Sequence, residues 1–247
     1  MEKKRFLLRV AYDGTAYCGW QLQPQVKTVE GELNRCLSAL TGEEIQVIGA
    51  SRTDAGVHAY GNVAVFDSAT SIPAEKLPYA LNQRLPEDIR IQSGVQVADD
   101  FHPRHCDSRK TYEYRIHCSD FPMPTARLYS YFTYHQLDVE LMQQAADALL
   151  GEHDFTSFCS AKTEKENKVR TLYDFTVRRE GQDVVIRVTG SGFLYNMVRI
   201  LAGTLMKVGQ GAMKPEQIPG VLEAKDRTKA GPTLPPEGLT LVEIKYL

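Results

Sequence analysis

The stretch that decides the fold is residues 45–66, IQVIGASRTDAGVHAYGNVAVF. Its first part, residues 45–50, is a short apolar run that predicts a buried strand. Its last part, residues 60–66, alternates side chains with the period of two that is typical of a strand. The polar connection between them, residues 49–59, is short, and catalytic groups collect on such connections because the flanking scaffold is rigid.

The segments on either side of this stretch predict a mixture of helices and strands. Apolar residues recur at helical spacing over residues 28–41, with Thr28 placed to cap the helix and Gly42 placed just after its end. The other predicted elements of this half are a strand at 5–12, a short helix that begins near Pro73 and ends before Pro86, and a strand at 89–97.

The second half repeats this style. Residues 170–179 and 183–189 predict a β-hairpin with Gly181 in its turn. The other predicted elements are a strand at 110–117, a helix from Asp138 to Leu150 closed by Gly151, a helix at 192–208, a short helix that opens at Pro215, and a strand at 239–246.

The element order is β-α-β-β-α-β followed by β-α-β-β-α-α-β, and it predicts an α+β fold. We expect two ferredoxin-like halves, residues 1–103 and 104–247. Their strands would join into one mixed, mostly antiparallel sheet, with helices on one face and the other face partly open.

The composition is that of an ordinary globular protein. The chain has 247 residues, of which 43% are apolar and 24% are charged. No apolar run approaches the length of about 18 residues that a membrane span needs. The five cysteines are odd in number and include no C-x-x-C pair, which argues against a zinc ribbon or a disulfide framework. Because no export signal is visible, we expect a reducing, cytoplasmic location.

The net charge of −2 argues weakly against a nucleic-acid partner, but phosphate binding needs only local positive charge. Two segments, residues 102–117 and 162–179, are locally basic. From composition alone, both are best interpreted as solvated loop or strand charges. Their cations are Arg104, Arg109, Lys110 and Arg115 in the first segment, and Lys162, Lys165, Lys168, Arg170, Arg178 and Arg179 in the second.

The polar connection carries three candidate catalytic or binding side chains. Asp54 lies at its centre, with Arg52 two residues before it and His58 four residues after it. Gly49 and Gly56 permit backbone conformations closed to other residues, and therefore favour a tight loop that projects Asp54. From the residues alone, an Asx turn is the simpler interpretation of Asp54. Arg52 is equally a surface charge, and His58 a buried or strand-edge histidine.

This connection, GASRTDAGVHA, is one of several ordered motifs that together cover nearly the whole chain. The others are YDGTxYxGWQ at 12–21, ALNxxLPxDI at 80–89, KTYxYRI at 110–116, GxHDFxSF at 151–158, GSGFLYNMVR at 190–199 and AGPTxPPxGL at 230–239. In this order they resemble the TruA family of pseudouridine synthases. The chain departs from the family pattern at Val65, Pro103 and Leu234, and we expect none of these to touch the catalytic residues.

The resemblance implies a reaction. Family members isomerise uridine to pseudouridine in tRNA: the uracil is detached from C1′ at N1, turned, and rejoined through C5. Chemistry at an anomeric carbon commonly uses a carboxylate, and the resemblance gives this catalytic role to Asp54. Asp54 either attacks C1′ or removes the C2′ proton, and the sequence does not separate the two routes.

The resemblance also implies a catalytic Arg199. A cation beside Asp54 would offset the effect of burial and keep the carboxylate ionised. Arg199 lies in an otherwise apolar segment, with Asn196 and Gly203 on the same helical side, where small and polar residues let another group approach closely. The alternative is a surface arginine whose stem lies along apolar residues.

Tyr112 resembles the active-site tyrosine of the family. It would stack on the uracil and help to remove the C5 proton, directly or through a water. The alternative is a half-buried strand tyrosine. We expect Tyr112 and Tyr114 to face opposite sides of their strand, and the motif selects Tyr112.

Other residues would contact the RNA, on an open face that forms a cleft. Arg52 would help to extrude the target base, and His58 would face the RNA as well. Contacts to phosphates are expected from Arg104, Arg109, Lys110 and Arg170, so that tRNA affinity falls with salt. No metal or cofactor is expected, because substrate and product are isomers. The cluster of His102, His105, Cys106, His117 and Cys118 fits no zinc spacing.

The family resemblance further implies a homodimer that acts on the anticodon stem-loop, at uridines 38, 39 and 40. Two alternatives remain open at the level of the sequence. A non-catalytic RNA-binding module would use the same open sheet. A glycosidase would need a second carboxylate or an activated water near Asp54, and the loop carries no second acidic residue.

Overall fold

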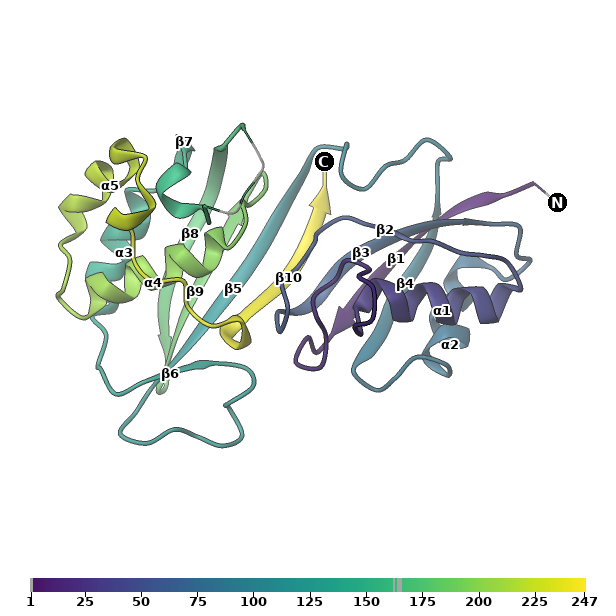
Figure 1. Cartoon of the computed structure of the whole chain (residues 1–247), viewed down its shortest axis with the longest axis horizontal. Helices are drawn as coiled ribbons and strands as arrows, with labels where there is room; N and C mark the ends of the chain where they lie inside the picture. The colour runs from purple at the N-terminus through teal and green to yellow at the C-terminus, as the bar shows by residue number, and fades with distance from the viewer. Residues whose placement is uncertain (1, 162, 164–165) are drawn as a thin grey trace. The chain divides into compact units, whose positions relative to one another are not determined.

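The computed structural model describes residues 2–161, 163 and 166–247 (Figure 1). The described strands and helices make a mixed α+β protein with a large, ten-stranded mixed sheet, which confirms the expected fold class. Contacts divide the chain into two compact units, Met1–Ser108 with Leu241–Leu247 and Arg109–Thr240. Within the described ranges, none of the helices has the length and apolar character that crossing a membrane requires.

The first unit has the β-α-β-β-α-β order. Its strands are β1 (Lys4–Tyr12), β2 (Ile48–Gly49), β3 (His58–Ser68) and β4 (Ile89–Val97), hydrogen bonded in the antiparallel order β4-β1-β3-β2. This is the arrangement expected of a ferredoxin-like unit. The C-terminal strand β10 (Leu239–Tyr246) lies beside β3, and its residues from Leu241 onward belong to this unit.

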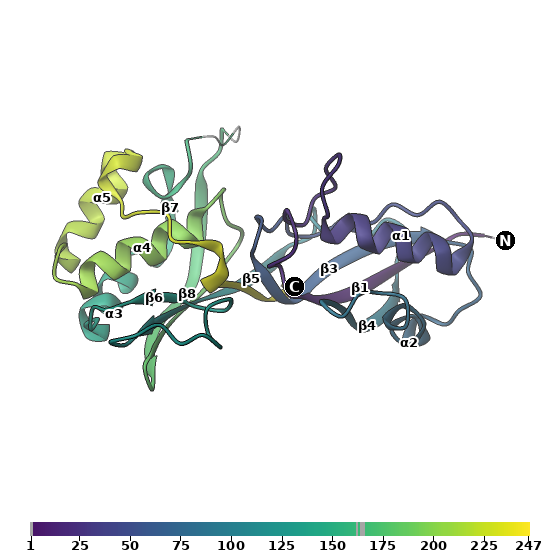
Figure 2. The same cartoon turned by 60° about the horizontal axis from the view of Figure 1, so that its bottom comes forward.

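The two helices of this unit are α1 (Val29–Thr41) and α2 (Leu77–Asn82), and α1 runs along the strands in Figure 2. Alternate residues of β1 from Phe6 to Tyr12 are buried, whereas Arg9 between them is exposed. One face of β1 is therefore covered and the other is partly open, as the period of two requires. Both predicted signals of α1 are confirmed: the Thr28 side chain accepts a hydrogen bond from Gly31 N, and Gly42 is left-handed.

The second unit is built on a long hairpin. Strands β8 (Val169–Glu180) and β9 (Asp183–Gly190) pair around Gly181, whose φ of 61° confirms the predicted turn. The strand order is β5-β9-β8-β7, with β5 at Ser108–Cys118 and β7 at Gly151–Asp154. Its helices are α3 (Val139–Asp147), α4 (Met197–Gly209) and α5 (Ile218–Ala224), and α3 packs against α4.

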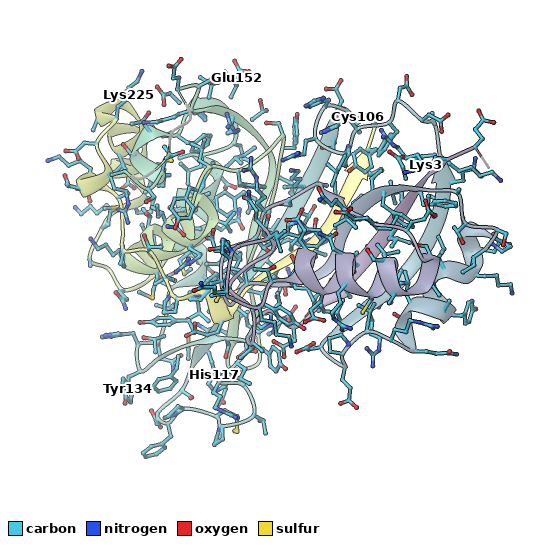
Figure 3. All side chains as sticks on the ribbon, turned by 45° about the vertical axis from the view of Figure 1, so that its right-hand side comes forward. Lys3, Cys106, His117, Tyr134, Glu152 and Lys225 are labelled. Atoms are coloured by element: carbon cyan, nitrogen blue, oxygen red, sulfur yellow. The ribbon has the colours of Figure 1, made fainter. Side chains whose placement is uncertain are left out.

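Two short strands of this unit, β6 (Tyr131–Thr133) and β7, were not predicted. Strand β6 pairs in parallel with the end of β5. It brings the ring of Phe132 to 6.5 Å from that of His117 and to 4.7 Å from that of Tyr134, measured between centroids. Figure 3 labels two of these residues, His117 and Tyr134. Three residues between turns carry too little periodicity to be recognised in a sequence.

Several predicted boundaries were wrong. The strand expected over residues 45–50 is only the two-residue β2. The helix expected from Asp138 to Leu150 ends at Asp147, although Asp138 caps it as predicted through Leu141 N. The helix expected from residue 192 begins at Met197, because Asn196 is left-handed with φ 60° and cannot continue a helix. The predicted division into 1–103 and 104–247 stays a prediction.

Candidate functional site

The loop that carries Asp54 is a turn at the entrance to β3. Asp54 is half-buried between a buried Thr53 and an exposed Ala55. The Val57 amide donates to the Asp54 carbonyl at 3.2 Å, and Gly56 takes a φ of 78° that favours glycine. The conformation predicted for Gly56 is therefore confirmed, whereas Gly49 has no positive φ and instead leaves room for the Trp20 ring, which an added Cβ would approach to 2.1 Å.

A second segment, residues 12–20, holds the loop from the side. The Trp20 amide donates to the Thr53 carbonyl at 3.0 Å, and the Gly56 amide donates to the Tyr17 carbonyl at 3.3 Å. A Cβ at Gly14 would lie 2.0 Å from the Val57 carbonyl oxygen, so only glycine permits this approach. Two motifs that are distant in the sequence thus meet around Asp54.

Three other residues of this neighbourhood were not predicted as site residues, namely Tyr17, Lys27 and Asp88. The Tyr17 hydroxyl donates to Asp88, and the Lys27 ammonium lies 4.4 Å from the centre of the Tyr17 ring. Lys27 also approaches Asp88 at 3.6 Å. Burial, together with the hydrogen bond to Asp88, raises the pKa of Tyr17 well above its ordinary value. A signal existed, because Tyr17 and Asp88 both belong to quoted motifs, but only folding brings them together.

His58 and Arg52 differ in exposure. His58 is only 4% exposed, its Nδ1 accepts the Gly14 N–H at 3.1 Å, and Asp13 lies 3.2 Å from the same nitrogen. Arg52 is exposed and donates to the Gln21 side chain at 3.4 Å. His58 thus supports the loop from within, while Arg52 is available to a ligand in solution.

Tyr112 lies in the second unit, on β5. It is 7% exposed, and its ring packs edge-on against Phe193 at 5.1 Å between centroids. Tyr114 is fully buried, and its hydroxyl donates to the Pro235 carbonyl at 2.7 Å. The expectation that the two tyrosines face opposite sides was wrong, since strand residues two apart share a face.

Arg199 is held within the second unit by neighbouring polar groups. Its Nε donates to the Leu234 carbonyl at 2.6 Å, and its terminal nitrogen donates to the Asn196 side chain at 2.8 Å. The expectation that Leu234 touches no catalytic residue was therefore wrong, although the contact is through its backbone. A Cβ at Gly203 would lie 2.0 Å from the Pro232 carbonyl, so the segment that approaches this side of α4 belongs to the chain itself.

The predicted phosphate-binding cations have different surroundings. Arg104 and Arg109 are exposed, and the Arg109 guanidinium lies 4.5 Å from the centre of the Tyr173 ring. Lys110 is half-buried. The Arg170 side chain donates to the carbonyls of its own loop, and burial lowers its pKa.

The remaining charges of the second basic segment are partly engaged. Arg178 pairs with Glu180 at 2.7 Å and with Glu113 at 3.3 Å, so it is a structural charge. Arg179 donates to the Leu137 carbonyl. Lys162 and Lys165 lie outside the described residues.

The histidines and cysteines whose spacing fits no zinc site have ordinary contacts. The rings of His102 and His105 stack at 3.7 Å, and His117 bonds to Asp183 at 2.7 Å. All five cysteines are free thiols. Across residues 2–161, 163 and 166–247, no group of three or more His, Cys, Asp or Glu side chains is placed to hold a metal ion.

Comparison with known proteins matches most of the chain to one family. The family described as tRNA pseudouridine synthase matches residues 9–105 and 145–247. The tRNA pseudouridine synthase A of Caldicellulosiruptor bescii is 46% identical over 243 residues, which cover 98% of this chain and 100% of that protein. The protein of the same name from Bacillus subtilis is 45% identical over 244 residues, which cover 98% and 99%.

A solved structure, described as "Structure of H/ACA RNP bound to a substrate RNA containing 2'-deoxyuridine", is also similar, at 13% identity. The match covers 81% of this chain and 44% of that chain with a TM-score of 0.38, which is too low to carry a conclusion. The family match and the full-length relatives are decisive by themselves: the chain belongs to the tRNA pseudouridine synthase family.

Proposed function

We propose that this chain isomerises uridine to pseudouridine in the anticodon stem-loop of tRNA, at positions 38, 39 and 40. The isomerase activity follows from the family. The observation that carries the proposal is the full-length match to relatives named tRNA pseudouridine synthase A, which includes the segment around Asp54. The choice of stem-loop and of positions rests on the motif resemblance alone.

Asp54 is the proposed catalytic group. The N1–C1′ bond breaks, a C5–C1′ bond forms, N1 gains a proton, and C5 releases one. A carboxylate can serve this chemistry as a nucleophile at C1′ or as a base at C2′. The proposal is supported by the loop, since its backbone is held on both sides of Asp54 by hydrogen bonds to Tyr17 and Trp20. Such fixed geometry is what positioning a reacting group requires.

We assign supporting roles to Arg199 and Tyr112. Arg199 would keep Asp54 ionised by an ion pair, as the family motif implies. Tyr112 would stack on the uracil and take part in removal of the C5 proton. Asp54 belongs to the first unit and the other two residues to the second, so these roles stay predictions from the motifs.

RNA binding is proposed to rest on exposed and half-buried cations. Arg52, which is exposed beside Asp54, would stabilise an extruded base. Arg104, Arg109, Lys110 and Arg170 would contact phosphates. The low exposure of His58 makes a support of the loop its better role, and direct RNA contact its alternative. A cytoplasmic homodimer is part of the same proposal.

The experiment is tritium release from C5-labelled uridine in tRNA transcripts. Wild-type protein should release tritium, and Asp54→Asn should release none while tRNA affinity is retained. Asp99→Asn, an exposed carboxylate outside the loop, is the matched control and should behave as wild type. A wild-type protein that binds tRNA without release would be a binding module. One that yields free uracil would be a glycosidase.

Transcripts in which uridines 38, 39 and 40 are replaced one at a time test the finer assignment. Each replacement should remove the pseudouridine at that position only. Modification that persists elsewhere after all three are replaced would refute the assignment to the anticodon stem-loop, but not the activity.

A further inference from the structure

A fully buried asparagine lies beneath the Asp54 loop. Asn62 is 0% exposed and sits on β3 opposite Val10, which is equally buried. An amide in such surroundings is costly unless its polar atoms are hydrogen bonded. All of its groups are used: Nδ2 donates to the Ser51 carbonyl at 2.9 Å and to the Tyr12 hydroxyl at 3.2 Å, and Oδ1 accepts from Val63 N at 2.8 Å.

The chain of hydrogen bonds continues from Asn62 into the loop. The Tyr12 hydroxyl lies 2.7 Å from the Thr53 hydroxyl. Either hydroxyl can be the donor of this bond, because the Tyr12 oxygen can accept the Asn62 amide and still donate or accept once more. Tyr12 and Thr53 are only 5% and 7% exposed, so water competes little for these bonds.

Asn62 lies on the buried face because it is opposite the buried Val10 in the regular part of the pairing between β1 and β3. A β-bulge follows it: Tyr12 is opposite Ala59, so β3 has one residue more than β1 over this interval. Such β-bulges re-aim side chains and are common beside active sites. The bulge thus lies between Asn62 and the start of β3, where the Asp54 loop enters the strand.

We propose that Asn62, Tyr12 and Thr53 form a relay of positioning residues that sets the orientation of Asp54. The relay makes two hydrogen bonds to the loop just before Asp54, one to the Ser51 carbonyl and one to the Thr53 hydroxyl. None of the three is proposed to touch the uridine. The inference rests on the proposed catalytic role of Asp54 and adds how its geometry is imposed.

The competing explanation is that the relay only satisfies buried polar atoms and stabilises the fold. The two explanations differ in which quantity changes. A purely structural relay alters the free energy of unfolding and leaves the folded enzyme as active as wild type. A positioning relay lowers kcat in folded protein while the affinity for tRNA is kept, because misplacement of a reacting group acts on the chemical step.

The test uses variants that remove single hydroxyl groups and little volume. Tyr12→Phe and Thr53→Val each break the link between the two side chains, and Thr53→Ser restores the hydroxyl. We expect kcat to fall roughly tenfold to a hundredfold in Tyr12→Phe and Thr53→Val, as small misplacements do. Thr53→Ser should recover most of the rate. The double variant should be no slower than the slower single variant, since each substitution already breaks the bond between Tyr12 and Thr53.

Tyr246→Phe is the matched control. The Tyr246 hydroxyl donates to the Pro103 carbonyl at 3.0 Å, in the same unit but outside the relay. It should lose stability without loss of kcat. Thermal unfolding of each variant shows whether it is folded at the assay temperature. If Tyr12→Phe does not fold, the comparison of Thr53→Val with Thr53→Ser alone distinguishes a positioning relay from a purely structural one.

Unchanged kcat in folded Thr53→Val would overturn the relay, as would a loss that appears only in KM. A Thr53→Ser variant as slow as Thr53→Val would overturn it as well. These outcomes leave the proposed function intact, because wild-type protein would still form pseudouridine. A wild-type protein with no tritium release would instead remove the function on which the relay rests.

Discussion

Replacement of Gly14 by alanine tests how closely the Asp54 loop is packed. An ideal Cβ at this position would lie 2.0 Å from the Val57 carbonyl oxygen and 2.6 Å from its carbon. Both are backbone atoms, so no side-chain rotation relieves the overlap, and the carbonyl must retreat by about 1.4 Å to reach an ordinary contact of about 3.4 Å. Overpacking of this kind costs roughly 1–3 kcal/mol in the free energy of unfolding.

The displacement should also reach the chemistry. Val57 closes the turn through its bond to the Asp54 carbonyl. A shift of about 1 Å near a reacting group can lower the rate on the order of a hundredfold. In Gly14→Ala we therefore expect a lower midpoint of thermal unfolding together with a slower single-turnover release of tritium, and tRNA affinity close to wild type.

A second glycine supplies the control. Gly220 lies within α5, and a Cβ there would meet nothing within 4 Å. Gly220→Ala should raise stability by roughly 0.5–1 kcal/mol, because a helical glycine loses more chain entropy than alanine, and should leave the rate unchanged. A Gly14→Ala protein that is as stable and as fast as wild type would refute the reasoning from close packing.

Two further outcomes concern stability. Thr28→Ala removes the acceptor for Gly31 N at the start of α1 and should cost about 1 kcal/mol in thermal or denaturant unfolding, while Thr28→Ser retains it. The Arg5 guanidinium, which makes two hydrogen bonds of 2.7 Å to Asp67, lowers the pKa of that carboxyl. A lowered folded pKa means that the pair stabilises the protein above the ordinary carboxyl pKa of about 4 and is lost as the pH falls further. The stability gap between wild type and Asp67→Asn should therefore shrink in acid, and a gap that widens would contradict the assignment.

Local chemistry explains which elements the sequence predicted well. The start of α1 depends on Thr28 and its end on Gly42, and both act within a few residues of their own position. The start of α4 was wrong for the opposite reason. The apolar pattern continues through Phe193 and Leu194. In the structure, however, Phe193 packs against Tyr112 and Asn196 has a left-handed backbone. The spacing of apolar residues predicts neither feature.

In the candidate site, too, the sequence predicted what depends on neighbouring residues and missed what depends on tertiary contacts. Asp54 could be singled out from a polar loop between two strands and from the motif around it. The support of that loop could not, because Tyr17 and Asp88 are 71 residues apart and meet only through tertiary packing. The exposure of His58 was also beyond the sequence: its place on β3 allowed either face, and the contact with Gly14 decides for burial.

Asp54 and Arg199 are each held by neighbours within their own unit. Asp54 depends on the segment from Tyr12 to Trp20 and on β3, all within the first unit. Arg199 depends on Asn196 and on the backbone of Leu234, both within the second unit. The bonds of the Tyr12 relay end on the loop that carries Asp54, at the Ser51 carbonyl and the Thr53 hydroxyl. Changes in that relay should therefore reach the chemistry through the position of Asp54, because misplacement of a reacting group acts on the chemical step.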